Sequence, residues 1–558
     1  MSNLNVLAER GQQRHRIRLL SLGLSAVLCF TATIAFAGCN IPYPNTDDVV
    51  TCSTASPNPD TYGVHATYTP ASSASTNVTV TIETGASIST NVAAVRIYNN
   101  SIATNNGFVS TTGANHAYGI WAGNPDNATI VSGGYGNTLI NNGSITTSSA
   151  GSPGLYTRTR HATIGNTIIN TGAITTSGGT VTSSGRTSSG IRTESRENST
   201  INNSGTITVN GAGGNGIEVM GVGTITNTGT ITSAQGCGIV GSYLLQGATY
   251  YAGLTLDNAG EISGASCAIS LSGGADTVII RPGAVLTGSI DGGGVSLTPS
   301  GQDKLIFNGF LDADFDNTIL KFNLLQATGN ADVGLTATDY TFDQVQIDAD
   351  SSLTFIDTTL TVPSGIINNG ALTFNNTALS VPSDIVNNGA LTFNNSQTVG
   401  NLTNNGSINM DTGTVGTQLT TDDYVSDGVF AMNAALDAGS SSDRLIVTGT
   451  LTGSTTLYIT NFGGAGAQTT GDGILVVDAS GAVITPGASF TLAAPLIAGN
   501  YQYTLHQGGI GGNNPQNWYL RSTARSSATA IPTLNPAALV LLALALMAVA
   551  SRIRNRAR

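Results

Sequence analysis

The sequence has little charge and almost no lysine. Charged residues make up 9% of the 558 residues, whereas hydrophobic residues make up 40%. Eight of the 20 basic residues lie in two terminal clusters, so residues 38–530 carry 12 basic against 31 acidic residues, a net charge of −19, and contain only two lysines, Lys304 and Lys321. An acidic body with so few cations repels nucleic acid and anionic lipid. Nucleic-acid binding is therefore excluded as a function.

Cysteine is scarce as well. Of the five cysteines, Cys29 lies in the N-terminal segment that is interpreted below as a signal peptide. In an oxidising compartment the other four form two local pairs, Cys39 with Cys52 and Cys237 with Cys267, or remain buried thiols. No CxxC or histidine spacing indicates zinc, so we expect neither a metal site nor a cofactor.

Helix-forming residues are also scarce in the body of the chain. The sequence instead holds 70 glycines and many Thr, Ser and Asn residues, which separate short aliphatic groups such as Val278–Ile280 and Leu305–Phe307. So polar a chain would be disordered without apolar residues, but here they are abundant and come in strand-length pieces. We therefore predict an all-β protein with many turns.

The turns repeat along the chain. An Asn-x-Gly-x-Ile motif recurs with its glycines 29, 33, 24 and 31 residues apart. Its copies are Asn141–Ile145, Asn170–Ile174, Asn203–Ile207, Asn227–Ile231 and Asn258–Ile262. A closer copy has a period of 19 residues, because Val362–Phe374 is repeated as Val381–Phe393, and Asn404–Ile408 continues the series.

Repeats of roughly 20 to 30 residues with strand chemistry are typical of solenoids, in which each coil buries its aliphatic side chains by stacking on its neighbours. No helix-forming segment lies within the repeats. We therefore predict a right-handed parallel β-helix over residues 61–420, preceded by an N-terminal cap segment at residues 38–60. Gly and Asn are expected to supply corners with positive φ. The Asn residues are interpreted as corners stacked in internal ladders, not as ligands.

Three aspartates, Asp276, Asp303 and Asp443, follow a Gly-x or Ser-x pair and precede an aliphatic strand. Gly273–Asp276 resembles part of an RTX nonapeptide, which implies a calcium site. RTX sites need tandem nonapeptides, however, and these copies are isolated. We favour a structural role for these carboxylates.

The densest acidic cluster consists of Asp339, Asp343, Asp348 and Asp350. Some β-helical proteins are polysaccharide lyases or hydrolases, and paired carboxylates for glycoside cleavage must converge to about 5–10 Å. The sequence contains no Gly-x-Ser-x-Gly nucleophile motif. We expect a strand with solvated acidic positions and no catalytic residues.

Residues 421–521 lack the 19-residue period. They resemble the C-terminal, autochaperone-containing end of pertactin-like autotransporter passengers, in the stretches Ser441–Gly449, Leu457–Gly466, Thr470–Val477, Tyr501–Leu505 and Trp518–Leu520. The resemblance implies a β cap that seals the open end of the solenoid and nucleates coil stacking. A linker at residues 522–530 follows. The 37 residues after Arg521 are too few for that family's translocator barrel, so we expect another route to the surface.

The N-terminus carries an export signal. Four arginines precede a mostly apolar stretch that ends in Ala35-Phe36-Ala37, an A-x-A-like signal-peptidase site. Residues 1–37 are therefore predicted to be a signal peptide that is cleaved before Gly38. The alternative is a lipobox at Phe36–Cys39, with Cys39 acylated after cleavage.

The C-terminus carries a short motif, an apolar run at residues 537–550 and a cluster of arginines. Its key residues are Ile531, Pro532, Thr533, Leu534, Arg552, Arg554, Arg556 and Arg558. This layout resembles the IPTL-CTERM protein-sorting signal of Gram-negative bacteria. The resemblance implies that residues 531–558 hold a transmembrane helix with its arginines on the cytoplasmic side, recognised by an inner-membrane sorting enzyme of the exosortase type.

These features together indicate an exported β-helical surface protein that is not an enzyme. We expect it to be tethered by the C-terminal helix before processing, and then to lie at the cell surface, in the outer membrane or outside the cell. The passenger resemblance implies adhesion, or interaction with a matrix or biofilm, through an unidentified surface or polysaccharide ligand. Trp121 is expected to pack on a coil face, although an exposed Trp121 would stack on a sugar. The alternatives are a polysaccharide-active enzyme and a structural spacer without a ligand.

Overall fold

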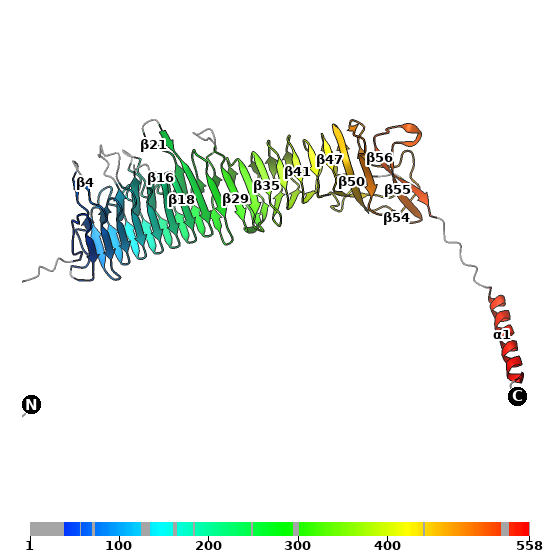
Figure 1. Ribbon diagram of the computed structural model, residues 1–558, viewed down its shortest axis with the longest axis horizontal. Helices are drawn as coiled ribbons and strands as arrows, with labels where there is room; N and C mark the ends of the chain where they lie inside the picture. Colours follow the sequence, from blue (N-terminus) through cyan, green and yellow to red (C-terminus); the bar gives the residue numbers. More distant parts are fainter. Residues whose placement is uncertain are drawn as a thin grey trace, which may run out of the picture. The chain divides into compact units, whose positions relative to one another are not determined.

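The computed structural model describes residues 38–525, apart from residues 56, 70–72, 124–133, 160–163, 182–184, 247–248, 294–300 and 439–440, together with residues 535–556. Within these residues the chain is almost entirely β, with one short 3-10 turn at Ile510–Gly512 and one helix, α1 (Pro536–Arg556). Most strands pair in parallel, coil upon coil (Figure 1). The prediction of an all-β, parallel β-helix is confirmed.

Each coil contributes one strand to each of three faces, which follow one another along the chain as the first, second and third face. The first face begins with β1 and ends with β52. Its strands are β1 (Val49–Cys52), β5 (Thr79–Ile82), β8 (Ile102–Asn105), β11 (Thr138–Asn141), β14 (Thr167–Asn170), the C-terminal parts of β16 (Ile191–Asn203) and β18 (Ile217–Asn227), β23 (Gly253–Asn258), β26 (Thr277–Ile280), β29 (Lys304–Asn308), β32 (Leu324–Thr328), β35 (Gln344–Ile347), β38 (Ile366–Asn368), β41 (Ile385–Asn387), β44 (Leu402–Asn404), β47 (Tyr424–Ser426), the start of β50 (Thr450–Asn461) and β52 (Val483–Ile484).

The second face follows the Asn-x-Gly corner of each coil. Its strands are β6 (Ser87–Thr90), β9 (Phe108–Thr111), β12 (Ser144–Thr147), β15 (Ala173–Thr176), β17 (Thr206–Val209), β19 (Thr230–Ser233), β24 (Glu261–Gly264), β27 (Val285–Thr287), β30 (Leu311–Phe315), β33 (Asp332–Leu335), β36 (Ser352–Ile356), β39 (Ala371–Asn375), β42 (Ala390–Phe393), β45 (Ser407–Asn409), β48 (Val429–Ala434), the end of β50 and β53 (Ser489–Leu492).

The third face closes each coil. Its strands are β2 (Val64–His65), β7 (Val95–Ile97), β10 (Ile120–Gly123), β13 (Leu155–Thr159), the N-terminal parts of β16 and β18, β20 (Cys237–Ser242), β25 (Cys267–Ser270), β28 (Ile290–Asp291), β31 (Ile319–Leu320), β34 (Asp339–Thr341), β37 (Thr359–Thr361), β40 (Ala378–Ser380), β43 (Gln397–Thr398), β46 (Gln418–Thr421), β49 (Arg444–Val447) and β51 (Ile474–Asp478). Two small hairpins, β3 (Tyr68–Thr69) with β4 (Ser73–Ala74) and β21 (Leu244–Gln246) with β22 (Thr249–Tyr251), lie outside these ladders.

The core fills the inside of the coils. Side chains alternate between inside and outside along a strand, so the isoleucine of each Asn-x-Gly-x-Ile motif points inward. All five of these isoleucines have no exposed surface: Ile145, Ile174, Ile207, Ile231 and Ile262. Farther along, Phe355, Phe374 and Phe393 stack in successive coils, with ring centroids 5.9 and 5.5 Å apart. The repeats seen in the sequence are therefore the coils of the core.

The motif asparagines form amide ladders inside the corner between the first and second faces. The Nδ2 of each donates to the Oδ1 of the next at 2.7–2.8 Å, from Asn105 through Asn141, Asn170, Asn203 and Asn227 to Asn258. A second ladder joins Asn368, Asn387 and Asn404. All of these residues are buried. They are structural, as expected, and the ladders satisfy polar groups whose burial would otherwise be costly.

The glycines of the motif work differently from the prediction. None of Gly143, Gly172, Gly205 or Gly229 has a positive φ, and neither do the ladder asparagines. Instead, a Cβ at Gly205 would lie 2.1 Å from the carbonyl oxygen of Gly172, and the other motif glycines meet the preceding corner in the same way. Glycine is needed because each corner rests directly on the one before it, so the expectation of left-handed corners at this motif was wrong.

Both ends of the coil stack are closed. At the N-terminus Cys39 and Cys52 form a disulfide, and the Cys39 amide donates to the buried Asp60 carboxylate at 3.0 Å. Near the C-terminus β51 pairs in antiparallel fashion with β56 (Trp518–Ala524), which continues to β55 (Tyr501–Gln507) and β54 (Leu496–Ala498). This antiparallel sheet ends the parallel ladders, as a cap must.

The parallel ladders themselves continue beyond residue 420, where the 19-residue period stops. β47 pairs with β44 and with β50, and β50 pairs with β53. The period is lost because the coils acquire longer connections, such as the one between β50 and β51, and not because stacking ends. The change to antiparallel pairing lies at β51–β56. Because β56 runs to Ala524, the antiparallel sheet extends beyond residue 521 into the segment predicted as a linker.

The helix α1 covers the predicted apolar run. Asn535 Oδ1 accepts the Ala538 amide at 2.8 Å, which caps the helix, and Pro536 occupies its first turn, where a missing N–H costs nothing. Its 21 residues span roughly 31 Å, about the thickness of a bilayer core. By length and composition α1 is able to cross a membrane.

The two asparagine rows of the corner give a matched test. Asn387 lies in the buried ladder, whereas its neighbour Asn388 lies in an exposed ladder with the same 2.8 Å geometry to Asn369 and Asn405. We expect Asn387→Ala to lower the free energy of unfolding by about 2–3 kcal/mol, because Asn404 Oδ1 loses its donor inside the core. Asn388→Ala should cost less than about 0.5 kcal/mol. Urea unfolding measures both, and equal costs would contradict a stabilising role for the buried ladder.

Candidate functional site

The third face of the N-terminal coils differs from the other faces. Residues of β11, β12 and β14 alternate between buried and partly exposed, but every residue of β10 and β13 is buried. The ring of Tyr118, which precedes β10, packs against the outward-pointing rings of Trp121 and Tyr156. Outward-pointing side chains on this face therefore pack against protein instead of water, and they are large and polar.

The parallel register gathers these side chains into a row. Arg96 of β7, Trp121 of β10, Tyr156 of β13, Arg192 of β16 and Glu218 of β18 are successive Cα partners. Neighbouring coils are about 4.8 Å apart, so these side chains contact one another. A second row, two residues farther along each strand, holds Arg158, Glu194 and Met220.

Aromatic rings dominate the N-terminal part of the row. Trp121 is 6% exposed and stacks on Tyr156 with centroids 6.3 Å apart, while Tyr118 lies 5.7 Å from Trp121 and 5.0 Å from Tyr156. The Arg96 guanidinium lies 4.7 Å from the Trp121 ring centroid, a cation–π contact. Trp121 thus packs on a coil face, as predicted, and its ring is covered rather than open to a sugar.

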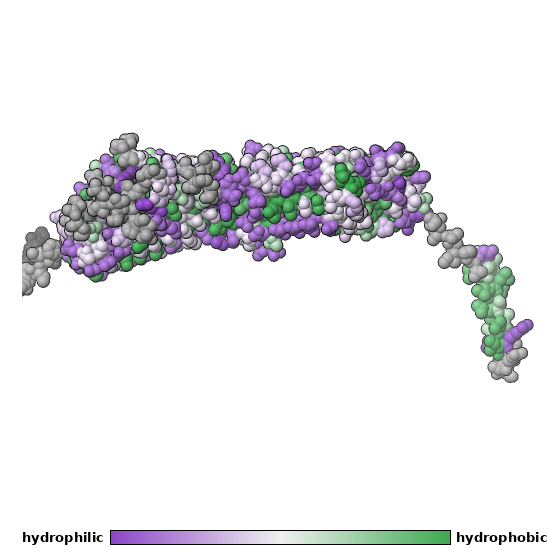
Figure 2. Space-filling model, turned by 45° about the horizontal axis from the view of Figure 1, so that its top comes forward, coloured by the Kyte–Doolittle hydropathy of each residue, from purple (hydrophilic) through white to green (hydrophobic). Residues whose placement is uncertain are grey.

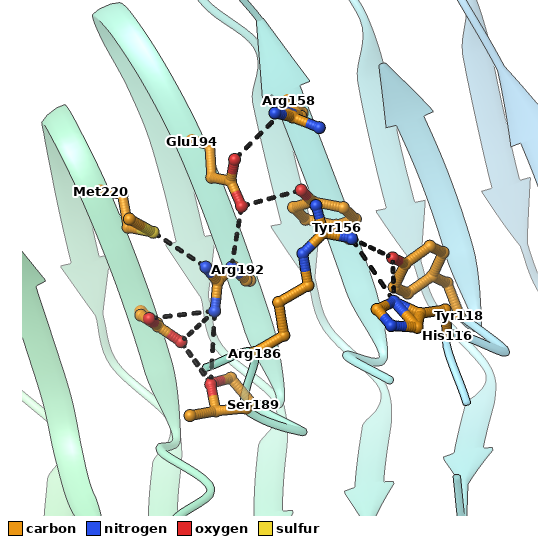
Figure 3. A network of polar contacts seen from close by, with 11 residues as sticks. His116, Tyr118, Tyr156, Arg158, Arg186, Ser189, Arg192, Glu194 and Met220 are labelled. Atoms are coloured by element: carbon orange, nitrogen blue, oxygen red, sulfur yellow. Dashed lines mark hydrogen bonds and ion pairs between the residues drawn. The ribbon is translucent and has the colours of Figure 1, made fainter. Parts of the chain in front are cut away.

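Ion pairs dominate the next part of the row (Figure 3). Glu194 pairs with Arg158 and with Arg192, each at 3.2 Å, and accepts a hydrogen bond from the Tyr156 hydroxyl at 2.8 Å. Arg192 also pairs with Glu218 at 3.0 Å. All of these charged side chains are 9% exposed or less as residues. Buried charges are tolerated only when paired in this way.

Burial and charge shift the pKa values in this network. Burial raises the pKa of the Tyr156 hydroxyl well above its usual value, and the Glu194 carboxylate adds to that rise. Burial opposes the charge on Arg192, but Glu218 and Glu194 outweigh it, so the pKa of the guanidinium is raised. Tyr156 is therefore a neutral donor and Arg192 a permanent cation.

A hairpin adds exposed aromatic rings to the same face. β21 and β22 lie against β16 and β18, and the hairpin projects beyond the coils (Figure 1). Tyr243, Leu245 and Tyr250 are 42%, 50% and 42% exposed, and the two tyrosine rings meet at 5.3 Å. Arg196 of β16 stacks 4.6 Å from the Tyr251 ring centroid and donates to its hydroxyl. We call the third face from β7 to β20, with this hairpin, the arginine–aromatic face.

The charge of this region is opposite to that of the rest of the body. Residues 84–251, which span this face, contain six basic against four acidic residues, whereas the remainder of residues 38–530 contains six basic against 27 acidic residues. The six basic residues are Arg96, Arg158, Arg160, Arg186, Arg192 and Arg196. This contrast is visible in the sequence, and sequence reasoning missed it because the charge was summed over the whole body.

The acidic cluster of the sequence analysis does not converge on one site. Asp339 and Asp343 line a groove of about 400 Å³ together with Lys321. Asp350 lines a different groove, of about 480 Å³. Asp348 approaches Gln326 Nε2 at 3.4 Å and lines neither groove. The four carboxylates separate because strands and turns point them to different sides of a coil.

The three Gly-x-Asp or Ser-x-Asp aspartates bind backbone amides. Asp276 accepts the Leu254 amide at 2.6 Å, Asp303 accepts the Asp276 amide at 2.9 Å, and Asp443 accepts the amides of Thr417 and Asn433 at 2.9 and 2.7 Å. Each carboxylate thereby joins neighbouring coils. Among the described residues no three His, Cys, Asp or Glu side chains are grouped to hold a metal ion.

The structure places the remaining predicted residues as follows. Cys39 pairs with Cys52, which uses the sulfur that acylation of Cys39 would need, and Cys237 pairs with Cys267 between β20 and β25. Gly38 begins the described chain. Arg552 and Arg554 are exposed on α1, which ends at Arg556. The predicted residues that lie outside the described ranges are Ala35, Ala37, Ile531, Pro532, Thr533, Leu534 and Arg558.

Two protein-family models match parts of the chain. The model of a type 1 autochaperone domain matches residues 396–505, and the model of the third pectate lyase-like domain of BigA matches residues 70–279. The first overlaps the predicted cap, and the second overlaps the coils that carry the arginine–aromatic face. Both matches fit the resemblance to autotransporter passengers.

Similar proteins come from Gram-negative bacteria. The adhesin BmaC autotransporter of Brucella suis is 32% identical over 141 residues, which is 24% of this chain and 4% of that protein. The autotransporter adhesin AIDA-I of Escherichia coli is 33% identical over 117 residues, 20% of this chain and 9% of that protein. The chain thus aligns with less than a tenth of these relatives. The Hap adhesin of Haemophilus influenzae has a solved structure that covers 83% of this chain and 60% of its own, at 14% identity and a TM-score of 0.28. The chain is autotransporter passenger-like.

Removing one charge should expose how much the buried network stabilises its coils. Glu194→Gln removes the carboxylate that pairs with Arg158 and leaves Arg192 with only one carboxylate, so we expect the free energy of unfolding to fall by about 3 kcal/mol. Glu261→Gln, on the exposed side of the second face, is the control and should cost less than about 0.5 kcal/mol. Urea unfolding followed by circular dichroism measures both. Equal stability of the two variants would contradict the role given to Glu194.

The Asp276 carboxyl should make stability depend on pH. Burial raises its pKa from 3.8 to about 7; the Leu254 amide opposes this shift, and the nearby Asp303 adds to it. Between about pH 4 and pH 7 the folded chain holds a proton that the unfolded chain has released, so stability falls as the pH rises. The expected loss is roughly 2–4 kcal/mol.

Asp276→Asn tests this expectation, because Asn cannot ionise but keeps an oxygen to accept the Leu254 amide. Its free energy of unfolding, measured in urea at several pH values, should vary less between pH 4 and pH 7 than that of the unmodified chain. Asp384→Asn, at an exposed position, should leave the profile unchanged. An unaltered profile in Asp276→Asn would show that Asp276 does not titrate in this window.

Proposed function

We propose that this protein is an exported cell-surface adhesin that binds a surface, matrix or biofilm polymer through the flanks of its coil stack and is delivered by its C-terminal sorting signal. The passenger-like coils and the adhesins among its relatives support an extracellular role. A rod that presents long flanks is suited to many simultaneous weak contacts. Its acidic charge keeps such a protein soluble.

The observation that carries this proposal is a row of hydroxyl groups on the second face. Eight successive coils place a serine or threonine at the same outward position, about 4.8 Å from the next. The row consists of Ser89, Ser110, Thr146, Thr175, Thr208, Thr232, Ser263 and Thr287. The stacking of the coils does not require hydroxyl groups on the outside.

The first face repeats the pattern. Seven of eight successive coils have threonine at one outward position, with Ile102 as the exception. The row runs through Thr79, Thr138, Thr167, Thr200, Thr224, Thr255 and Thr277. Hydroxyl groups both donate and accept hydrogen bonds, so such rows suit a polymer with its own repeating polar groups. Each hydrogen bond to the polymer is weak, but many of them along one row raise the overall affinity.

Delivery follows from the two ends of the chain in this proposal. An N-terminal signal peptide exports the chain, and α1 tethers it until a sorting enzyme of the exosortase type acts at Ile531–Leu534. The length of α1 and the arginines that follow its apolar run support a membrane tether. Mass spectrometry of both termini of the mature protein tests the processing.

Adhesion is tested on cells that produce the full chain. We expect these cells to adhere to matrix-coated and biofilm-coated surfaces severalfold more than cells without it. A variant with Thr146→Val, Thr175→Val, Thr208→Val and Thr232→Val should lose most of this gain, because valine keeps the strand but removes the hydroxyls. Surface display is checked in parallel with an antibody.

The same substitution in the C-terminal coils serves as the control. Thr354→Val, Thr373→Val and Thr392→Val alter an in-register row of the same face but leave the eight-coil row intact, so adherence should mostly persist. If displayed chain gives no gain in adherence at all, the protein is a spacer and the proposal fails. If the four-valine variant adheres fully, the hydroxyl row is not the adhesive surface.

A further inference from the structure

The arginine–aromatic face has more hydrogen-bond donors than acceptors. Three buried N–H groups on it have no partner: Arg96 Nε, Trp121 Nε1 and Arg196 Nε. Trp121 is 94% buried, since only 6% of its surface is exposed. A buried donor without an acceptor costs about 1–3 kcal/mol. The interior of this face is therefore short of hydrogen-bond acceptors, which favours an acceptor-rich ligand at its arginines.

The charge of the face specifies the sign of that ligand. Among its described side chains, Glu194 and Glu218 neutralise Arg158 and Arg192, but the positive charges of Arg96 and Arg196 face aromatic rings instead of carboxylates. The rest of the body is acidic, so this face is where an anion is attracted. Guanidinium groups recognise carboxylates with two parallel hydrogen bonds.

The exposed rings specify the kind of molecule. Tyr243 and Tyr250 present tyrosine faces and hydroxyls at the edge of the arginine-bearing strands, and Tyr251 holds Arg196 beside them. Aromatic rings with a polar tip suit surfaces that are apolar on one side and wet on the other, as the face of a sugar ring is. An anion that also packs against such rings is an acidic sugar.

The spacing of the two cationic ends specifies a polymer. Arg96 and the strand that carries Arg196 are three coil steps apart, about 14 Å. A single carboxylate cannot reach both ends, whereas a chain of sugars can. A membrane surface fits less well, because acidic coils flank the face on its C-terminal side and anionic lipid would be repelled by them.

We propose that the arginine–aromatic face binds an acidic polysaccharide that carries carboxylate groups, with Arg96 and Arg196 as its charge contacts and Tyr243 and Tyr250 as its stacking contacts. The inference rests on the proposed adhesive function and names the chemistry of one ligand. Because the contacts are charge-assisted, binding weakens as salt rises and screens them.

Binding of the full chain to immobilised alginate, a polymer of uronic acids, tests the proposal. Neutral dextran is the comparison. We expect saturable binding to alginate and none to dextran, with affinity falling at least tenfold between 50 and 500 mM salt. Arg96→Gln, Arg196→Gln and Tyr250→Ala should each weaken binding at least fivefold. Arg196→Lys, which keeps the charge but not the forked donor, should weaken it less than Arg196→Gln.

Matched variants outside the face control for general effects. Arg281→Gln removes an arginine that is paired with Asp257 on the first face, and Tyr458→Ala removes a tyrosine that is 53% exposed on the second face. Both should bind alginate as the unmodified chain does. Circular dichroism tests whether each variant is folded, and Tyr250→Ala, at an exposed position, remains informative if the arginine variants do not fold.

The outcomes separate this proposal from the adhesive function. Equal binding to dextran, unchanged affinity in Tyr250→Ala and Arg96→Gln, or preference for phosphatidylserine vesicles or DNA over alginate would each overturn it. Cells that adhere although the chain does not bind alginate would leave the adhesive function standing and this ligand refuted. Alginate binding without any gain in cell adherence would refute the adhesive function instead.

Discussion

The close stacking of one corner on the next is the constraint on which the rest of this protein depends. The Asn amide of each coil bonds to the next coil, while the motif glycine leaves no Cβ between one corner and the carbonyl beneath it. Together these contacts hold neighbouring coils in one register. Without the amide bonds each buried asparagine would be a cost of about 1–3 kcal/mol, so the ladder makes a polar corner compatible with an aliphatic core.

Because the register is fixed, equivalent outward positions of successive coils line up in a row. When such a position has the same residue type in each coil, the same chemical group recurs along the row. A row of hydroxyl groups causes no electrostatic repulsion and gives the face a continuous polar surface. For charges it is expensive, because two like charges about 4.8 Å apart repel by roughly 3 kcal/mol at an effective dielectric constant near 20. On the third face this repulsion is avoided because opposite charges alternate between coils: Arg158 is the Cα partner of Glu194, and Arg192 is the Cα partner of Glu218. Asp276 and Asp303 are like charges in successive coils; burial raises the pKa of Asp276, and the nearby Asp303 adds to that rise.

The sequence was a good guide wherever a residue type repeats. The Asn-x-Gly-x-Ile motif predicted the coils, the buried isoleucines and the amide ladders, because each copy meets the same environment. The motif predicted the wrong role for Gly143 and its equivalents, because glycine permits both a positive φ and a close backbone contact, and the sequence does not distinguish the two. The arginine–aromatic face was missed because Arg96, Trp121, Tyr156 and Arg192 are separated by 25, 35 and 36 residues and become neighbours only through the register. The acidic cluster shows the opposite case, in which proximity in the sequence does not mean proximity in space. Asp339 and Asp350 are close in sequence but line different grooves.

The order of the coils bears on how such a protein would meet a ligand. From β16, which carries Arg192 and Arg196, eleven steps of the first-face ladder lead to β50, or roughly 50 Å. The arginine–aromatic face is therefore separated from the cap by most of the coil stack. The coils between them carry most of the acidic residues, which keep neighbouring copies apart through their mutual repulsion. The stacked repeats therefore have two roles: they bury the core, and they set the distance between the cap and the arginine–aromatic face.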